Sequence, residues 1–264
     1  MMASAQKKLN MDITTVGTAA TFFHRYFATR SYFLNDRFLV ATACLYLAGK
    51  VVDSPKSARD VLFACFEHRF ASDPEAVRCR LLDREYVEAA RGRIFLAERA
   101  ILYAVAFDLV CPLPYEPLFR FLSEPSIRLA CETGQGPCSD VFGNCCLQLL
   151  HDSFQLPLCL EYSSEAVAGV MVWCALTLLK VEPTLGGGPH AWWIRTGLRP
   201  EQLATLAAQL VEEVYLRVET PSDALDDAEG AQNLELQGAN AIKAENGSDP
   251  GSADAYGALF DVLQ

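Results

Sequence analysis

Apolar residues recur along most of this chain at the three-to-four-residue spacing of an α-helix. Over 13–29, Val16, Ala20, Phe23 and Phe27 mark one such face. The same spacing predicts further helical segments over 37–50, 57–69, 84–107, 116–132, 139–154, 163–180, 190–195 and 200–217. The β-branched residues lie inside these patterns, and no tight hairpin motif separates them. The pattern predicts an all-α protein.

Polar and turn-forming residues separate the predicted helices. Asp36 and Ser57 stand where a side-chain oxygen can cap the helix that follows. The segment around Pro74 is predicted to be a polar loop. Proline disfavours helix in the residue before it, so the two prolines of 111–114 interrupt the chain and predict a domain boundary there.

A gapless shift of 127 residues aligns similar helical segments in the two halves of the chain. Superposed pairs are His24 with His151, Phe27 with Phe154, Val40 with Val167, Ala41 with Ala168, Ala48 with Ala175 and Tyr46 with Trp173. The matches fall in two segments of helix, turn and helix. They predict two related helical domains, in which the matched apolar residues form the cores.

Composition agrees with a folded chain of one large or two small domains. The chain has 264 residues, 51% of them hydrophobic. It contains neither eighteen uninterrupted apolar residues nor an apolar run after the lysines of its first ten residues, so neither a membrane span nor a secretion signal is expected. The ten cysteines lie mostly in apolar helical runs, which favours reduced, buried thiols.

Charge is concentrated near the C-terminal end. The 33 acids and 22 bases give a net charge of −11, and residues 222–264 hold nine of the acids but only one base, Lys243. The remaining −3 offers no basic field, so direct nucleic-acid binding is not expected. Residues 222–264 are predicted to be a disordered acidic tail. Its apolar cluster at 256–263 is compatible with a docking helix, although eight residues are too few to be helical alone.

No motif for catalysis or metal binding stands out. The sequence lacks a nucleophile elbow, a phosphate-binding loop and a dinucleotide fingerprint, and its His and Cys spacings do not match a zinc site. No metal or cofactor is expected. A Cys–His pair brought together by folding stays open as an alternative. The adjacent Trp192 and Trp193 are expected to anchor a short helix on the core.

Lys50 and Glu98 are charged residues beside strongly apolar helix faces. A charge in such a place needs a partner or access to solvent. One interpretation is an internal ion pair that only ties two helices together. The other is that the pair lies on a docking face and provides hydrogen bonds to another protein.

The segment FFHRYFATRSYFLNDRFLVATACLYLAGKV, followed by Pro55 and Lys56, resembles the cyclin box of transcriptional cyclins, and HAWWIRTGLRPEQLATLAAQLVEEVYLRVETP resembles the end of their second repeat. The resemblance runs from Leu9 to Pro221 and is strongest to the cyclin T and cyclin K group. It implies two tandem cyclin-box helical domains, 1–110 and 111–221, before the tail at 222–264. Only MMASAQKK precedes the similar segment, so the first domain is expected to lack most of its helix 1.

The resemblance also implies a function. Cyclins have no catalytic activity; they bind and activate a cyclin-dependent protein kinase, here one acting on the C-terminal repeats of RNA polymerase II in the nucleus. It places Lys50, Glu98 and Phe107 on the kinase-binding face, with Tyr46 and Leu47 as weaker candidates. The second repeat is expected to contact further transcription proteins. Alternatives are a non-activating cyclin-fold scaffold and an adaptor of the general-transcription-factor kind.

Overall fold

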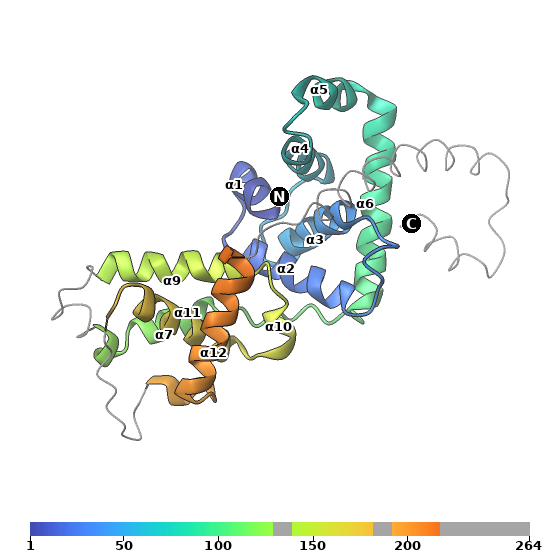
Figure 1. Ribbon diagram of the computed structural model, residues 1–264. Coiled ribbons are helices and arrows are strands. Elements are labelled where there is room, and N and C mark those ends of the chain that lie inside the picture. The colour runs from blue at the N-terminus through green and yellow to red at the C-terminus, as the bar shows by residue number, and fades with distance from the viewer. Residues whose placement is uncertain (129–138, 182–191, 217–264) are drawn as a thin grey trace. The chain divides into compact units, whose positions relative to one another are not determined.

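The computed structural model describes residues 1–128, 139–181 and 192–216 (Figure 1). Every regular element in these ranges is a helix, so the all-α prediction is confirmed. The helices group into two compact units that divide between Leu109 and Val110, next to the predicted boundary. The predicted acidic tail lies outside the described residues.

The first unit contains six helices among its described residues. They are α1 (Met2–Leu9), α2 (Thr14–Phe27), α3 (Arg37–Val51), α4 (Ala58–Arg69), α5 (Pro74–Leu82) and α6 (Arg84–Ala104). The short α1 stands where the sequence predicts a curtailed first helix. It packs on α4, with Ala5 buried and an ion pair between Lys8 and Glu67.

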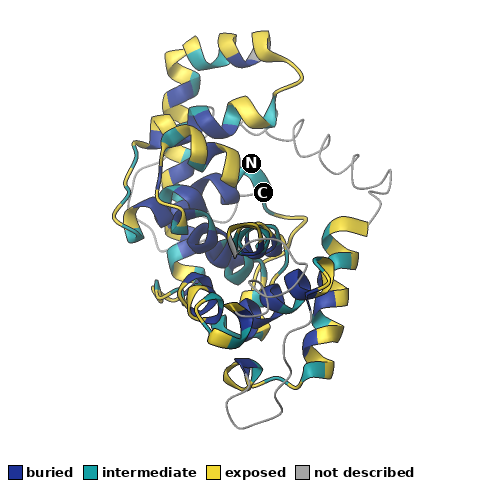
Figure 2. Ribbon diagram, turned by 90° about the vertical axis from the view of Figure 1, so that its left-hand side faces the viewer, coloured by how far each residue is buried: buried dark blue, intermediate teal, exposed yellow. Residues whose placement is uncertain are grey.

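Helix α3 is the centre of this unit and contacts α1, α2, α4 and α6. Its small residues Ala41, Ala43 and Ala48 are buried, and they allow neighbouring helices to approach closely on several sides. Helix α6 faces it with the buried Ile94 and Ile101, which are seven residues apart and therefore on one face. Figure 2 shows dark-blue buried residues where these helices meet and yellow exposed residues on their outer faces.

Asp36 fixes the start of α3. One carboxylate oxygen accepts hydrogen bonds from the backbone N–H groups of Phe38 at 2.9 Å and Leu39 at 3.2 Å. The other oxygen lies 3.7 Å from Arg69 and 3.9 Å from Arg93. Burial lowers the pKa of the Arg93 guanidinium, and the negative charge of Asp36 opposes that shift. The predicted cap at Asp36 is confirmed, and its carboxylate also joins α3 to α4 and α6.

The predicted cap at Ser57 is confirmed as well, because its hydroxyl accepts a hydrogen bond from the Asp60 N–H at 3.1 Å. The predicted loop around Pro74 is wrong, since α5 begins at this residue. Proline fits the first turn of a helix, where the N–H that it lacks would have no partner within the helix.

The second unit has the following described elements: α7 (Tyr115–Leu122), α9 (Ser139–Ser153), α10 (Leu158–Glu161), α11 (Ser164–Leu178), the 3-10 helix η1 (Trp192–Thr196), α12 (Pro200–Val211) and the π-helix η2 (Glu212–Leu216). The helix predicted over 116–132 is not continuous. It breaks at Ser123 and Glu124 and resumes at Pro125, because proline disfavours a helical residue before it. Residues 129–132 lie outside the described part.

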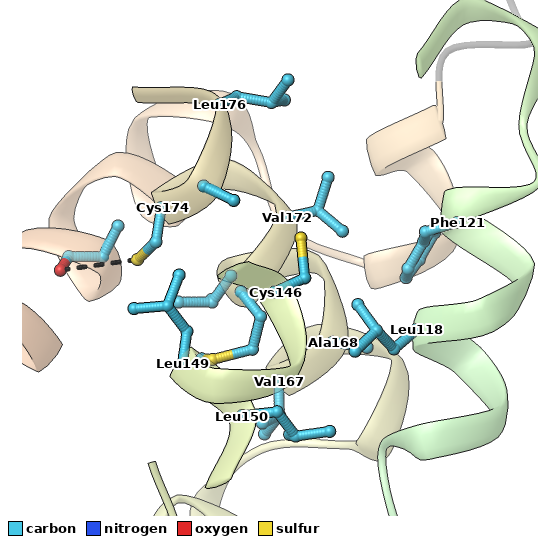
Figure 3. Packing of buried hydrophobic residues seen from close by; sticks show 14 of the residues in the cluster. Leu118, Phe121, Cys146, Leu149, Leu150, Val167, Ala168, Val172, Cys174 and Leu176 are labelled. Carbon is cyan, nitrogen blue, oxygen red and sulfur yellow. Dashed lines mark hydrogen bonds between the residues drawn. The ribbon is translucent and has the colours of Figure 1, made fainter. Parts of the chain in front are cut away.

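Helix α11 is the core of the second unit (Figure 3). Its buried face contacts Leu118 and Phe121 of α7 and Cys146 and Leu150 of α9. The Cys174 thiol donates to the Ala207 carbonyl at 3.8 Å, which adds a weak link to α12. Trp192 is buried against the same cluster and Trp193 is half-buried, as expected for an anchoring element.

The offset of 127 residues relates structural details of the two units. Asp36 and Ser163 occupy equivalent positions and cap α3 and α11. Asp53 and Lys180, also equivalent, both have left-handed backbones with φ of 53°. The two helices therefore begin in the same way and are followed by the same backbone turn. The division into two cyclin repeats stays a prediction.

All eight cysteines in the described ranges are free thiols; Cys131 and Cys138 lie outside these ranges. Burial raises the pKa of Cys65 to about 11 and that of Cys174 to about 12. Such thiols are poor nucleophiles near neutral pH and serve as small apolar side chains. Within the same part of the chain, no helix is long and apolar enough to cross a membrane.

The close packing of α11 against η1 at Gly169 predicts a sharp effect of one added methyl group. A Cβ at Gly169 would lie 2.3 Å from Cγ2 of the buried Thr196. We expect Gly169→Ala to lower the free energy of unfolding by about 1–3 kcal/mol through overpacking. Gly143→Ala is the matched control, because its Cβ would meet nothing nearer than 3.8 Å; it should stabilise α9 by roughly 0.5–1 kcal/mol. Denaturant unfolding measures both, and equal effects would contradict the packing described here.

Candidate protein-docking surface

Lys50 and Glu98 meet where the last turn of α3 crosses α6. The Lys50 ammonium lies 2.5 Å from the Glu98 carboxylate. The Glu98 side chain is only 11% exposed, whereas the Lys50 side chain is 41% exposed. The pair therefore ties α3 to α6, as the internal-pair interpretation predicts. It also leaves part of the Lys50 side chain accessible to another molecule.

Aromatic rings extend this site along both helices. The Lys50 ammonium lies 4.1 Å from the centre of the Tyr46 ring, close enough for a cation–π interaction. The Tyr46 ring lies 5.9 Å from that of Phe95, and the Arg91 guanidinium lies 6.0 Å from the Phe95 ring. Cationic and aromatic groups thus alternate across one surface.

Arg91 and Phe95 were not among the residues that the sequence picked out for this surface. Phe95 precedes Glu98 on α6 by three residues, and Arg91 precedes Phe95 by four. This spacing places all three on one helix face. That spacing could have identified them once Glu98 was a candidate.

Phe107 follows the end of α6, about two and a half helical turns beyond Glu98. Its side chain is 59% exposed, and its ring stands edge-on to Tyr103 at 5.6 Å. Ala106 and Phe107 both have left-handed backbones, with φ of 52° and 59°. Each such residue costs roughly 1–2 kcal/mol when it is not glycine. Two strained backbone residues therefore hold the Phe107 side chain in an exposed position.

Leu47 does not share this exposed surface. Its side chain is only 4% exposed and lies in the core of the first unit, one residue along α3 from Tyr46. Neighbouring residues of a helix point about 100° apart, so one can face solvent while the next is buried. We define the candidate docking surface, called the docking surface below, as Tyr46, Lys50, Arg91, Phe95, Glu98, Tyr103 and Phe107.

These groups suit protein recognition. Tyr and Arg are among the side chains that carry most binding energy when a protein partner covers them, and Phe is enriched in such interfaces. Among the described residues, no group of three or more His, Cys, Asp or Glu is placed to hold a metal ion. His24 and His151, which the 127-residue offset relates, each contact an aromatic ring, Phe23 and Tyr115 respectively.

Comparison with known proteins agrees with this description. The family model for the cyclin N-terminal domain matches residues 1–110. Cyclin-T1-3 of Oryza sativa subsp. japonica is 29% identical over 94% of this chain and 47% of the relative. Cyclin-T1-5 of Arabidopsis thaliana is 29% identical over 78% of this chain and 33% of the relative. The chain spans less than half the length of either protein. The predicted resemblance to the transcriptional cyclins of the cyclin T group is confirmed.

The left-handed backbone after α6 gives a prediction about stability. Ala106→Gly should raise the free energy of unfolding by about 0.5–1 kcal/mol, because glycine adopts this conformation without a Cβ clash and loses only part of the gain to chain entropy. Ala104→Gly, within the last turn of α6, is the control and should lower it by a similar amount. Thermal or denaturant unfolding distinguishes the two. A loss of stability in Ala106→Gly would contradict the strain described for this turn.

Proposed function

We propose that this chain is a cyclin and the regulatory subunit of a cyclin-dependent protein kinase, because it matches the cyclin N-terminal domain over residues 1–110 and is similar over most of its length to proteins of the cyclin T group. The docking surface of the first unit binds the kinase. The chain itself is not catalytic; it changes the conformation of a catalytic partner.

The observation that carries this proposal is the combination of Lys50 and Phe107 on one unit. Lys50 is anchored by Glu98 and by the Tyr46 ring, and its side chain stays 41% exposed. This geometry is suited to charge-assisted hydrogen bonds with main-chain carbonyls at the end of a helix in the kinase. Phe107 is exposed on a strained turn, which suits insertion into an apolar pocket of the same partner.

Activation would act through the kinase's own regulatory helix. Protein kinases are active only when a lysine of the catalytic lobe pairs with a glutamate on that helix. A cyclin surface that binds the inward position of the helix more tightly than the outward position shifts the population towards the active state. Differential binding of about 5.5 kcal/mol would convert a kinase from roughly 1% to roughly 99% active.

The substrate and the cellular setting follow from the family alone. As part of the same proposal, the kinase acts on the C-terminal repeats of RNA polymerase II, and the complex works in the nucleus. The second unit contacts further transcription proteins. An adaptor that binds DNA directly is disfavoured, because residues 110–217 hold eleven acids and six bases and lack the excess of positive charge that phosphate binding needs.

Kinase capture tests the proposal. The tagged full chain is incubated with an extract of its own cells, and the recovered kinase is assayed on peptides of the polymerase repeat. We expect Phe107→Ala to lower both recovery and phosphorylation at least tenfold, because it removes an exposed aromatic anchor. Phe119→Ala is the matched control; Phe119 is 53% exposed in the second unit and should change both by less than twofold.

Each outcome of this experiment has a distinct meaning. Recovery of a kinase that the chain does not stimulate would support a non-activating scaffold. Failure of the wild-type chain to recover any kinase, or equal losses with both phenylalanine variants, would contradict the proposed docking surface.

A further inference from the structure

The connection between α3 and α4 contains a serine that is followed by a proline. Of the 13 prolines in the sequence, Pro55 follows Ser54 and Pro221 follows Thr220, and each of the others follows a residue that is neither serine nor threonine. Proline has no backbone N–H, and proline-directed protein kinases select a hydroxyl residue that precedes it. Thr220 lies outside the described residues, so the structure bears on Ser54.

Ser54 lies where another protein can reach it. Residues 54–57 form neither helix nor turn; Ser54 is partly exposed, and Pro55 and Ser57 are exposed. The residue before a proline is restricted to extended backbone, which is the form in which protein kinases bind a substrate peptide. The Ser54 hydroxyl accepts a hydrogen bond from the Asp12 N–H at 3.1 Å, and this bond lies at the protein surface.

This hydrogen bond joins two connections of the first unit. Asp12 lies between α1 and α2, whereas Ser54 lies between α3 and α4. The side-chain amide of Gln6 in α1 donates to the Met11 carbonyl at 2.5 Å. Met11 is buried against the end of α3, where a Cβ at Gly49 would lie 2.5 Å from its methyl carbon. The Ser54 hydroxyl therefore helps to hold α1 and the residues after it on the end of α3.

Negative charge lies close to the Ser54 hydroxyl. Asp53 precedes it, and hydrogen bonds from the hydroxyl and the N–H of Thr14 lower the pKa of the Asp12 carboxyl, which is therefore charged at neutral pH. A phosphate would add a charge of about −1.5 to −2. Lys56 is the only base within three residues of Ser54 along the chain. Like-charge repulsion would therefore drive a phosphate on Ser54 away from Asp12.

We propose that a proline-directed protein kinase phosphorylates Ser54 and that the phosphate releases the segment before α2 from the end of α3. In the transfer, the Ser54 Oγ bonds to the γ-phosphorus of ATP, the bond from that phosphorus to the β–γ bridging oxygen breaks, and ADP leaves. The hydroxyl proton passes to the catalytic aspartate of the acting kinase. Neither the modification nor the release depends on the proposed kinase binding.

The release also has a consequence for the docking surface. Ser54 follows Lys50 by four residues, and the released segment packs on the same end of α3. Phosphorylation would therefore lower the affinity of the docking surface for its kinase. This consequence alone rests on the proposed function.

Ser57 is the alternative site in the same connection and fits less well. It is followed by Ala58 rather than by a proline. Its hydroxyl accepts from the Asp60 N–H at 3.1 Å and donates to the Asp60 carboxylate at 2.7 Å. A kinase acting on Ser57 would have to open this cap at the start of α4.

Phosphorylation in vitro tests the site. The full chain is incubated with ATP and a purified mitogen-activated protein kinase, which is proline-directed and needs no cyclin, and the phosphopeptides are identified by mass spectrometry. We expect phosphate on Ser54. Pro55→Ala should lower its rate of incorporation at least tenfold, whereas Thr220→Ala should leave that rate unchanged. Absence of phosphate from Ser54, phosphate on Ser57 instead, or a rate that Pro55→Ala does not change would overturn the assignment.

Hydrogen exchange measured by mass spectrometry tests the release. In the Thr220→Ala chain phosphorylated at Ser54, amide exchange of residues 6–14 should be at least tenfold faster than in the unmodified chain, and phosphatase treatment should restore it. Exchange in α9, which belongs to the second unit, should not change. Equal exchange of residues 6–14 with and without the phosphate would contradict the release.

Kinase capture tests the consequence for the docking surface. The phosphorylated chain should recover at least fivefold less kinase from cell extract than the unmodified chain. Equal recovery, together with faster exchange of residues 6–14, would contradict this consequence but not the release. Failure of the unmodified chain to recover any kinase would contradict the proposed function instead.

Discussion

The carboxylate of Glu98 is the constraint on which the first unit depends. It is almost fully buried on the face of α6 that packs against α3, and a buried carboxylate without a partner is strongly destabilising. Lys50 satisfies it only if the last turn of α3 crosses α6 at this point. The ion pair therefore sets where the two helices meet. Because the Lys50 side chain stays partly exposed, the same pair lies at a surface that includes Tyr46 and Phe95.

Each unit is organised around one helix that is buried on nearly all sides. The sequence allowed α3 and α11 to be predicted because their small and apolar residues leave no polar face, and α3 also because Asp36 precedes it as a cap; the cap of α11 at Ser163 emerged only from the structure. Local rules worked less well where proline was ambiguous. Pro74 begins a helix that was predicted as a loop, and Pro125 breaks one that was predicted as continuous. Proline destabilises the interior of a helix but is well accepted in its first turn. Tertiary packing determines whether a given proline ends one helix or begins the next.

The docking surface was predictable only in part. Lys50 and Glu98 were candidates because charges stood beside apolar faces, and their contact in the structure agrees with that reasoning. Arg91 and Phe95 were missed, although their spacing from Glu98 on α6 would have identified them once Glu98 was a candidate. Leu47 was a weaker candidate, implied by the cyclin resemblance because it lies on the same helix as Lys50, but its side chain is buried. The left-handed turn at Ala106 and Phe107 could not be foreseen, since neither residue is one that prefers this conformation.

A charge swap tests most directly whether the Lys50–Glu98 pair is a docking feature as well as a structural tie. The variants Lys50→Glu and Lys50→Glu/Glu98→Lys are compared for unfolding free energy and for kinase affinity. The account predicts that the swap recovers more than half of the stability that the single change loses, because opposite charges face each other again, while kinase affinity stays at least tenfold reduced. Recovery of both properties in the swapped chain would show that the pair only holds α3 and α6 together.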